Sequence, residues 1–174
     1  RGVVTGSRKE VDAGVVVTGA AMGSTRLYAS LSDMPVEFRA SSYTHAPRLL
    51  AQLRSLVSIN AAVEVDLLGQ VGAELRDGRY VGALGGQVDF SRAASLTGTR
   101  SIIALRSHDR GGSTVNERLR SGVVTMGRTD VDAIVTEHGV AHLTACSDEE
   151  RRRRMIRVAA PEHRDRLERS LRRA

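Results

Sequence analysis

Four sets of residues in this chain have types and spacings that could do chemistry. Glu64 and Asp66 alternate, so in a strand they would share one face, where two carboxylates can act as acid and base. The interpretation we favour is a solvated or hydrogen-bonded face. Cys146 is the single cysteine and has no neighbouring base in sequence, which favours an incidental thiol over a nucleophile.

Histidines and glycines provide the other two sets. Glu137-His138 is followed by His142, but the glutamate is not placed as in a metalloprotease helix, so we expect no metal site here. Gly85-Gly86 forms a flexible turn. Taken alone, such a pair is more often a plain turn than an oxyanion-binding site.

A helix and several strands are predicted to position these residues. Residues 88–96 follow the glycine turn with helical spacing, and Gly98 can end that helix. The near-continuous apolar runs 101–105 and 122–126 predict strands that are covered on both faces. Residues 133–136 form a third candidate strand. Between the first two strands, residues 107–113 predict a polar surface loop.

The preceding part of the chain predicts further elements of both kinds. Ser24 can cap a helix that runs over residues 25–31. Another helix is expected to open at residues 44–47 and to run to about Leu53, because proline is tolerated in the first turn. The predicted strands cover residues 14–18, 36–38 and 56–60, and a hairpin or meander covers residues 63–78. The class is therefore α/β, with antiparallel pairing mixed into the sheet.

Length and composition predict one soluble domain. The chain has 174 residues, of which 41% are hydrophobic, enough for one ordinary core over residues 1–174. Neither a secretion signal nor an apolar segment of membrane-spanning length is visible, so we expect a cytoplasmic protein without a membrane partner.

The net charge of +6 is concentrated near the C-terminus. Residues 147–174 hold ten arginines against six acids, and the acids precede arginines by four residues at Asp148/Arg152, Glu149/Arg153 and Glu150/Arg154. This spacing predicts a solvated helix capped by Ser147, followed by a second helix with Pro161 in its first turn. Because the charge is compensated locally and only 3% of residues are aromatic, we expect no nucleic-acid partner.

Four blocks of sequence carry a resemblance to a known family. They are Ser58 to Val71, Gly85 to Arg92, Ser101 to Leu105 and Asp130 to Leu143. In this order and spacing the chain resembles the C-terminal half of the acetyl-CoA hydrolase/transferase family, which includes acetate, succinate and 4-hydroxybutyrate CoA-transferases.

The resemblance implies a fold and a reaction. The fold is α/β of the CoA-transferase type, with a mixed, mostly parallel sheet flanked by helices, and with the active site between two similar halves. Members transfer CoA between an acyl-CoA and a carboxylic acid through a covalent glutamyl-CoA thioester. The family places that glutamate shortly before the segment matching Gly2 to Thr5, so we expect it upstream of Arg1, in an N-terminal half.

The resemblance also assigns the glycine turn to the CoA pocket. Gly85 and Gly86 would bring backbone N–H groups to the oxyanion that forms when a thioester is attacked. Asn60 would face the same pocket, and Gln87 would contact the substrate. Asp89 either faces the ligand or caps the following helix, and we favour the cap.

The expected ligands and partners follow from this assignment. CoA is the cosubstrate, a small carboxylic acid is the acceptor, and no metal is expected. The chain alone should be inactive without the N-terminal half, and a homodimer is a candidate assembly. Two alternatives stay open, a CoA-binding module without chemistry and a basic nucleic-acid-binding domain.

Overall fold

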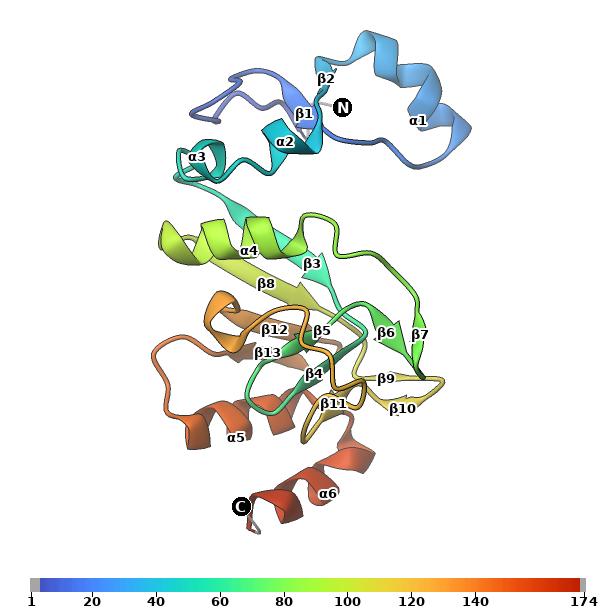
Figure 1. Ribbon diagram of the computed structural model, residues 1–174, viewed down its shortest axis with the longest axis vertical. Helices are drawn as coiled ribbons and strands as arrows, with labels where there is room; N and C mark the ends of the chain where they lie inside the picture. The colour runs from blue at the N-terminus through green and yellow to red at the C-terminus, as the bar shows by residue number, and fades with distance from the viewer. Residues whose placement is uncertain (1–3, 173–174) are drawn as a thin grey trace. The chain divides into compact units, whose positions relative to one another are not determined.

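The computed structural model describes residues 4–172, and the chain divides into two compact units at the boundary between Leu56 and Val57 (Figure 1). The first unit is a two-stranded parallel sheet with short helices, and in it Val16 pairs with Val36. Its elements are β1 (Val16–Thr18), α1 (Thr25–Ser30), η1 (Leu31–Asp33), β2 (Val36–Phe38), α2 (Ser41–Thr44) and α3 (Pro47–Leu50). The Ser24 side chain accepts a hydrogen bond from the Leu27 N–H, so the predicted cap of α1 is confirmed.

The helix predicted to run to Leu53 is wrong in its extent. It corresponds to α3, which has Pro47 in its first turn as predicted but ends at Leu50. Beyond that residue the backbone bonds span three residues, from the Gln52 N–H to the Leu49 carbonyl and from the Leu53 N–H to the Leu50 carbonyl. These bonds form turns and do not continue an α-helix.

The second unit contains a four-stranded sheet in the order β13-β12-β8-β3. Its strands are β3 (Val57–Ala61), β8 (Arg100–Ala104), β12 (Ala133–Thr136) and β13 (Gly139–His142). The β3–β8 and β8–β12 pairs are parallel, and the β12–β13 pair is antiparallel. The predicted α/β class with a mixed, mostly parallel sheet is therefore confirmed.

Smaller strands form three further sheets in this unit. A three-stranded sheet has the order β11-β4-β5, with β11 parallel and β5 antiparallel to β4. Two hairpins pair β6 with β7 and β9 with β10. The bounds are β4 (Glu64–Asp66), β5 (Val71–Gly72), β6 (Leu75–Arg76), β7 (Arg79–Tyr80), β9 (His108–Asp109), β10 (Gly112–Ser113) and β11 (Val115–Asn116).

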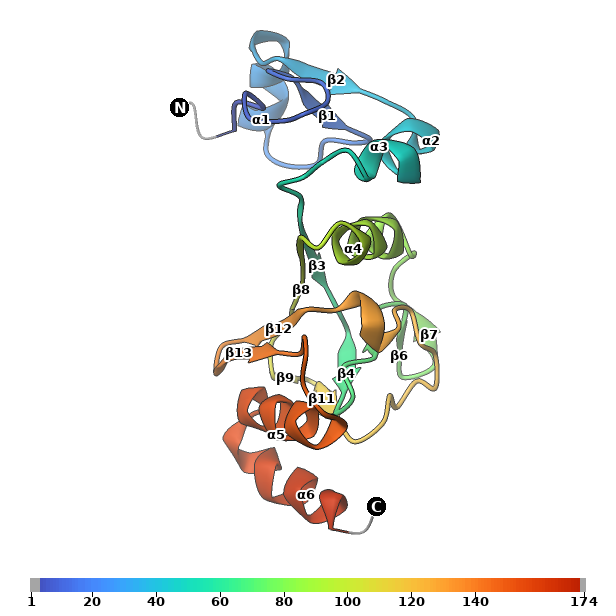
Figure 2. The same ribbon diagram turned by 90° about the vertical axis from the view of Figure 1, so that its left-hand side faces the viewer.

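The helix α4 (Gln87–Leu96) lies between β3 and β8 in the chain and packs against both strands (Figure 2). Two parallel strands need such a crossover, and the connecting helix then runs opposite to the strands. The N-terminus of α4 is therefore at the carboxyl ends of β3 and β8. This is the edge of an open α/β sheet at which ligands bind.

The core of the second unit joins the sheet to the last two helices, α5 (Asp148–Val158) and α6 (Pro161–Leu171). Ile103 and Ile134 of the sheet, Met155 of α5 and Leu167 of α6 each have 0% exposure. These side chains belong to one apolar cluster, whose burial stabilises the unit.

Two predictions about strands and loops are wrong. Residues 122–126 form no strand, and Met126 makes a single bridge to Val71. Gly122 has a φ of +70°, outside the extended region, and the Val124 side chain is 48% exposed, so the apolar run is not a covered strand. Residues 107–113, predicted as a loop, contain the short β9–β10 hairpin.

The C-terminal helices agree with the sequence in most respects. Ser147 accepts a hydrogen bond from the Glu150 N–H and caps α5. Glu149 pairs with Arg153 and Glu150 pairs with Arg154, as the spacing predicts. Asp148 instead bonds Arg128, at 3.1 Å. Within residues 4–172, every helix falls short of the length and apolar character that a membrane crossing needs.

Candidate functional site

The glycine turn forms the start of α4. Gly85 has a φ of +53°, which glycine adopts at little cost, and Gly86 is the N-cap residue. A methyl group added at Gly85 would meet nothing within 4 Å, so the turn borders open space. The first N–H groups of a helix have no partner inside it, and together with the helix dipole they favour negative charge. The turn can thus receive an anionic or carbonyl oxygen.

The Gln87 side chain lies directly behind this turn and is 8% exposed. Its Nε2 is buried and has no hydrogen-bond partner among the described residues. An unsatisfied buried donor costs about 1–3 kcal/mol, and natural proteins keep few of them. The Gln87 amide is therefore available to donate to a water molecule or a ligand oxygen.

Asn60 lies on β3 and is held against α4 by two serines. Its Nδ2 donates to the Ser58 Oγ at 2.9 Å and to the Ser91 Oγ at 3.3 Å, and the two serine oxygens are themselves 3.3 Å apart. Ser91 follows Gln87 by one helical turn, so both face the sheet. The predicted residues Asn60, in β3, and Gln87, one helical turn before Ser91 in α4, are therefore both on the β3–α4 seam.

Neither serine was identified from the sequence, although spacing could have found both. Ser58 precedes Asn60 by two residues in a strand, and Ser91 follows Gln87 by four in a helix, so each shares a face with a predicted site residue. The network also permits two orientations of the Asn60 amide, because a hydroxyl can either accept or donate. With the amide turned over, the Nδ2 donates away from the serines.

Asp89 lies in the first turn of α4 and is exposed. The expectation that it caps the helix is wrong, because Gly86 occupies the N-cap position. Asp89 is the third residue of α4, whereas a capping side chain belongs to the residue just before the helix, from which it accepts from the second or third amide. Its carboxylate is on the surface beside the glycine turn.

The paired carboxylates of β4 are structural. Glu64 is 3% exposed and accepts hydrogen bonds from the Asn116 side chain at 3.1 Å and from the N–H groups of Arg120 and Ser121 at 2.9 Å. Asp66 accepts from two backbone amides of the β4–β5 turn. The favoured hydrogen-bonded interpretation is confirmed, and burial raises the pKa of Asp66 above its usual value.

The other candidate side chains do not form a reactive group. Cys146 donates to the Leu143 carbonyl at 3.1 Å. His138 follows β12 and lies 3.8 Å from the neighbouring Glu137, while His142 ends β13 and is exposed. Neither histidine belongs to a group of three metal-ligating side chains in the part of the chain that the structure describes.

Glu137 joins the ends of two parallel strands. Its carboxylate accepts from the Ser107 N–H at 2.9 Å and from the Ser107 Oγ at 2.8 Å. These bonds stabilise the ionised form and lower the pKa of Glu137 to about 2. The side chain therefore fastens the segment after β8 to the segment after β12 while it is charged.

Glu137→Gln should destabilise the fold by about 1 kcal/mol at pH 7, a modest value because the carboxylate is half exposed and screened by solvent. Because the pKa of Glu137 is lower in the folded state than in the unfolded state, its bonds contribute their full stability above the unfolded-state pKa. That contribution is lost as the pH falls toward the folded-state pKa. The difference in free energy of unfolding between variant and parent should therefore be largest above about pH 4.5 and should shrink as the pH falls toward 2. Urea unfolding at pH 7, 4.5 and 3.5 measures it, and a constant difference would contradict this account.

Comparison with known proteins identifies the domain. Residues 23–171 match the model of the acetyl-CoA hydrolase/transferase C-terminal domain. The chain belongs to this family. It is 37% identical over 171 residues to a 4-hydroxybutyrate coenzyme A transferase of Clostridium kluyveri, and the match covers 95% of the chain. A succinyl-CoA:cyclohexane-1-carboxylate CoA transferase of Geobacter metallireducens is 36% identical, with 99% of the chain covered.

Solved structures agree with the CoA-transferase type of fold. The crystal structure of RipA from Yersinia pestis superposes with a TM-score of 0.89 and 39% identity, covering 99% of this chain and 40% of that one. The chain likewise spans 40% of the length of each of the two transferases named above. This acetyl-CoA hydrolase/transferase domain thus corresponds to well under half of those proteins.

Proposed function

We propose that this chain is the C-terminal domain of an enzyme that transfers CoA from an acyl-CoA to a small carboxylic acid, or hydrolyses the acyl-CoA. One observation carries the proposal: the buried, unpartnered Gln87 amide lies behind an open glycine turn at the start of α4. In a member of this family, that combination supports a pocket for the thioester end of CoA.

The reaction requires a nucleophile, an oxyanion site and a place for the leaving thiolate. A glutamate carboxylate attacks the acyl carbon, and the CoA thiolate leaves. The thiolate then attacks the glutamyl carbon, which forms the glutamyl-CoA thioester and releases the acyl group as a carboxylate. A second carboxylate then attacks the glutamyl carbon and expels the CoA thiolate, which attacks the new acyl carbon to form the product acyl-CoA and release the glutamate. If water attacks the glutamyl carbon instead, the glutamate and free CoA are released.

The described residues supply the electrostatic part of this cycle. The N–H groups around Gly85 and Gly86 would stabilise the oxyanion, and the Gln87 Nε2 would donate to a substrate oxygen. Asn60, held by Ser58 and Ser91, would fix a carbonyl or carboxylate in place. Asp89 lies on the rim of the same turn. The glutamate itself is proposed to come from an N-terminal half of the same enzyme.

The test compares this chain with the polypeptide that carries it in its natural source. Each is incubated with acetyl-CoA and excess carboxylate, and the CoA esters are followed by chromatography. We expect turnover by a polypeptide heavier than 18.8 kDa and none by the 174-residue chain. Robust turnover by the chain alone would contradict the proposal that the nucleophilic glutamate comes from an N-terminal half. A natural polypeptide of 18.8 kDa that binds CoA without turnover would favour a non-catalytic CoA-binding module.

Gln87→Met should separate stability from function. Methionine keeps the length of the side chain and removes the unsatisfied donor, so the free energy of unfolding should rise by about 1 kcal/mol. The same change should lower CoA transfer by the enzyme at least tenfold, because the substrate oxygen loses its donor. Urea unfolding and initial rates measure the two effects. A loss of stability with unchanged rate would show that the amide serves the fold.

A further inference from the structure

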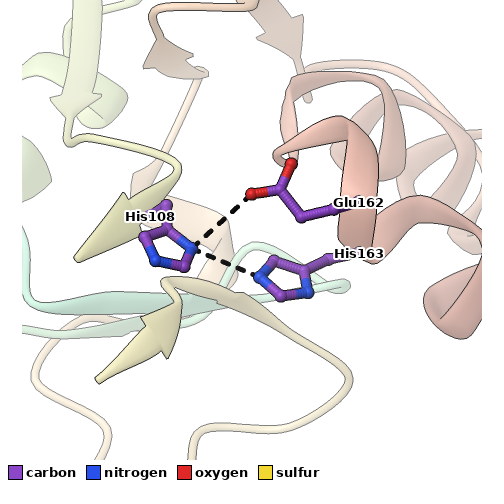
Figure 3. A group of neighbouring side chains, drawn as sticks. All are labelled: His108, Glu162 and His163. Atoms are coloured by element: carbon purple, nitrogen blue, oxygen red, sulfur yellow. Dashed lines mark hydrogen bonds and ion pairs between the residues drawn. The ribbon is translucent and has the colours of Figure 1, made fainter. Parts of the chain in front are cut away.

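We propose that His108, Glu162 and His163 form a binding site for a divalent transition-metal ion of the zinc class. The three side chains come from two distant segments of the second unit (Figure 3). His108 begins β9, and the other two lie in the first turn of α6. The site is separate from the glycine turn, and its test does not depend on CoA.

The two histidine nitrogens are spaced to bind one ion, and the Glu162 carboxylate lies close enough to join them after a small movement. The His108 Nδ1 lies 3.3 Å from the His163 Nε2 and 3.8 Å from the Glu162 Oε1. All three ligand atoms lie within 4.8 Å of one another. Two nitrogens that bind zinc tetrahedrally at 2.0–2.1 Å are about 3.4 Å apart. The observed nitrogen separation already matches this value.

The backbone on both sides of the site is fixed by contacts that do not use the histidines. In the β9–β10 hairpin, Asp109 accepts from the Gly111 N–H at 2.8 Å and pairs with Arg76 at 3.1 Å. In α6, Arg164 bonds the Ala159 carbonyl and Leu167 is fully buried. The backbone segments that carry the ligands are thus held in place without them, and removal of the ligand side chains should leave the fold intact.

The donor set determines the class of ion. Two imidazole nitrogens and one carboxylate oxygen suit zinc and its neighbours, whereas Mg²⁺ and Ca²⁺ prefer oxygen ligands. Three protein ligands leave a fourth position for water. The side chains of His108 and Glu162 are 49% and 59% exposed, so an ion can enter from solvent.

A hydrogen bond between the imidazoles is the competing explanation. One proton on the His108 Nδ1 could be donated to the His163 Nε2 without any ion. In that arrangement a protonated His108 would also pair with Glu162, at 3.8 Å. Zinc would use all three groups as well, and the titration below separates the two explanations. This cluster was not visible in the sequence, because its two histidines are separated by 55 positions, whereas His138 and His142 are close in the chain.

Calorimetric titration of the chelator-treated 174-residue chain with zinc chloride at pH 7.5 tests the proposal. We expect one ion per chain, and no comparable heat with magnesium chloride. His163→Ala should weaken zinc binding at least tenfold, and Glu162→Gln should weaken it several-fold. His142→Ala, which removes an exposed histidine outside the cluster, should leave the affinity unchanged.

Substitution of Co²⁺ for Zn²⁺ gives a second readout. A tetrahedral Co²⁺ site absorbs strongly in the visible range, and the band should vanish in His108→Ala, while circular dichroism shows that the variant is folded. Failure of the parent chain to bind zinc would overturn the proposal. So would zinc binding that is equal in the parent and the His163→Ala variant.

Discussion

Gly85→Ala is expected to lower CoA transfer about a hundredfold in the enzyme that carries this domain. The φ of +53° is strained for alanine by about 1–2 kcal/mol, so the turn must shift and move its N–H groups. The added methyl also enters the open space in front of the turn, where the substrate would approach. Loss of one oxyanion donor typically costs a factor of 10² to 10³ in rate.

Gly98→Ala is the matched control, at the other end of α4. Gly98 has a φ of +68°, and an added methyl there also meets nothing within 4 Å. The two variants should therefore lose similar stability in urea unfolding, while Gly98→Ala keeps most of the activity in initial-rate assays. Equal loss of rate in the two variants would show that general strain, and not the site, is responsible.

Glu64→Ala is expected to have the largest effect on stability, a loss of about 3 kcal/mol at pH 7. The change removes the acceptor for the Asn116 side chain and for the N–H groups of Arg120 and Ser121. Those donors would be left without their acceptor at a buried site, where Glu64 is only 3% exposed. Urea unfolding of the 174-residue chain measures the loss.

Two further variants separate the hydrogen bonds from the volume of the side chain. Glu64→Gln keeps the shape and one acceptor oxygen, so it should lose less, about 1–2 kcal/mol. Glu117→Ala removes an exposed carboxylate near the same loop and should change stability by less than about 0.5 kcal/mol. A loss in Glu64→Ala no larger than that in Glu117→Ala would contradict the structural role.

Local signals in the sequence predicted much of the fold. The caps at Ser24 and Ser147 are side-chain bonds to amides three residues away, which a sequence displays directly. The strand predicted over residues 122–126 is reduced to one bridge from Met126 to Val71 of β5, because Gly122 turns the backbone out of the extended region and Val124 is exposed. The extent of strand pairing is a tertiary property. Strand propensity alone therefore overcounted the sheet.

The candidate site was predictable only in part. The glycine turn, Gln87 and Asn60 were named from the family resemblance, and the structure adds the physical reason to group Asn60 with Gln87, the shared β3–α4 seam. The bonds of Glu64 could not be foreseen, because its donors are more than 50 positions away in the chain. Contacts between distant segments depend on the folded topology, which short-range spacing does not encode.

The most direct measurement is a titration of the ¹⁵N-labelled 174-residue chain with acetyl-CoA, followed by amide chemical shifts. The account predicts that the largest changes occur at the N–H groups of Gly85 and Gly86 and at the side-chain amides of Gln87 and Asn60, while Gly98 stays unshifted. Changes confined to other parts of the chain, or no change at saturating acetyl-CoA, would contradict the claim that the start of α4 receives the thioester.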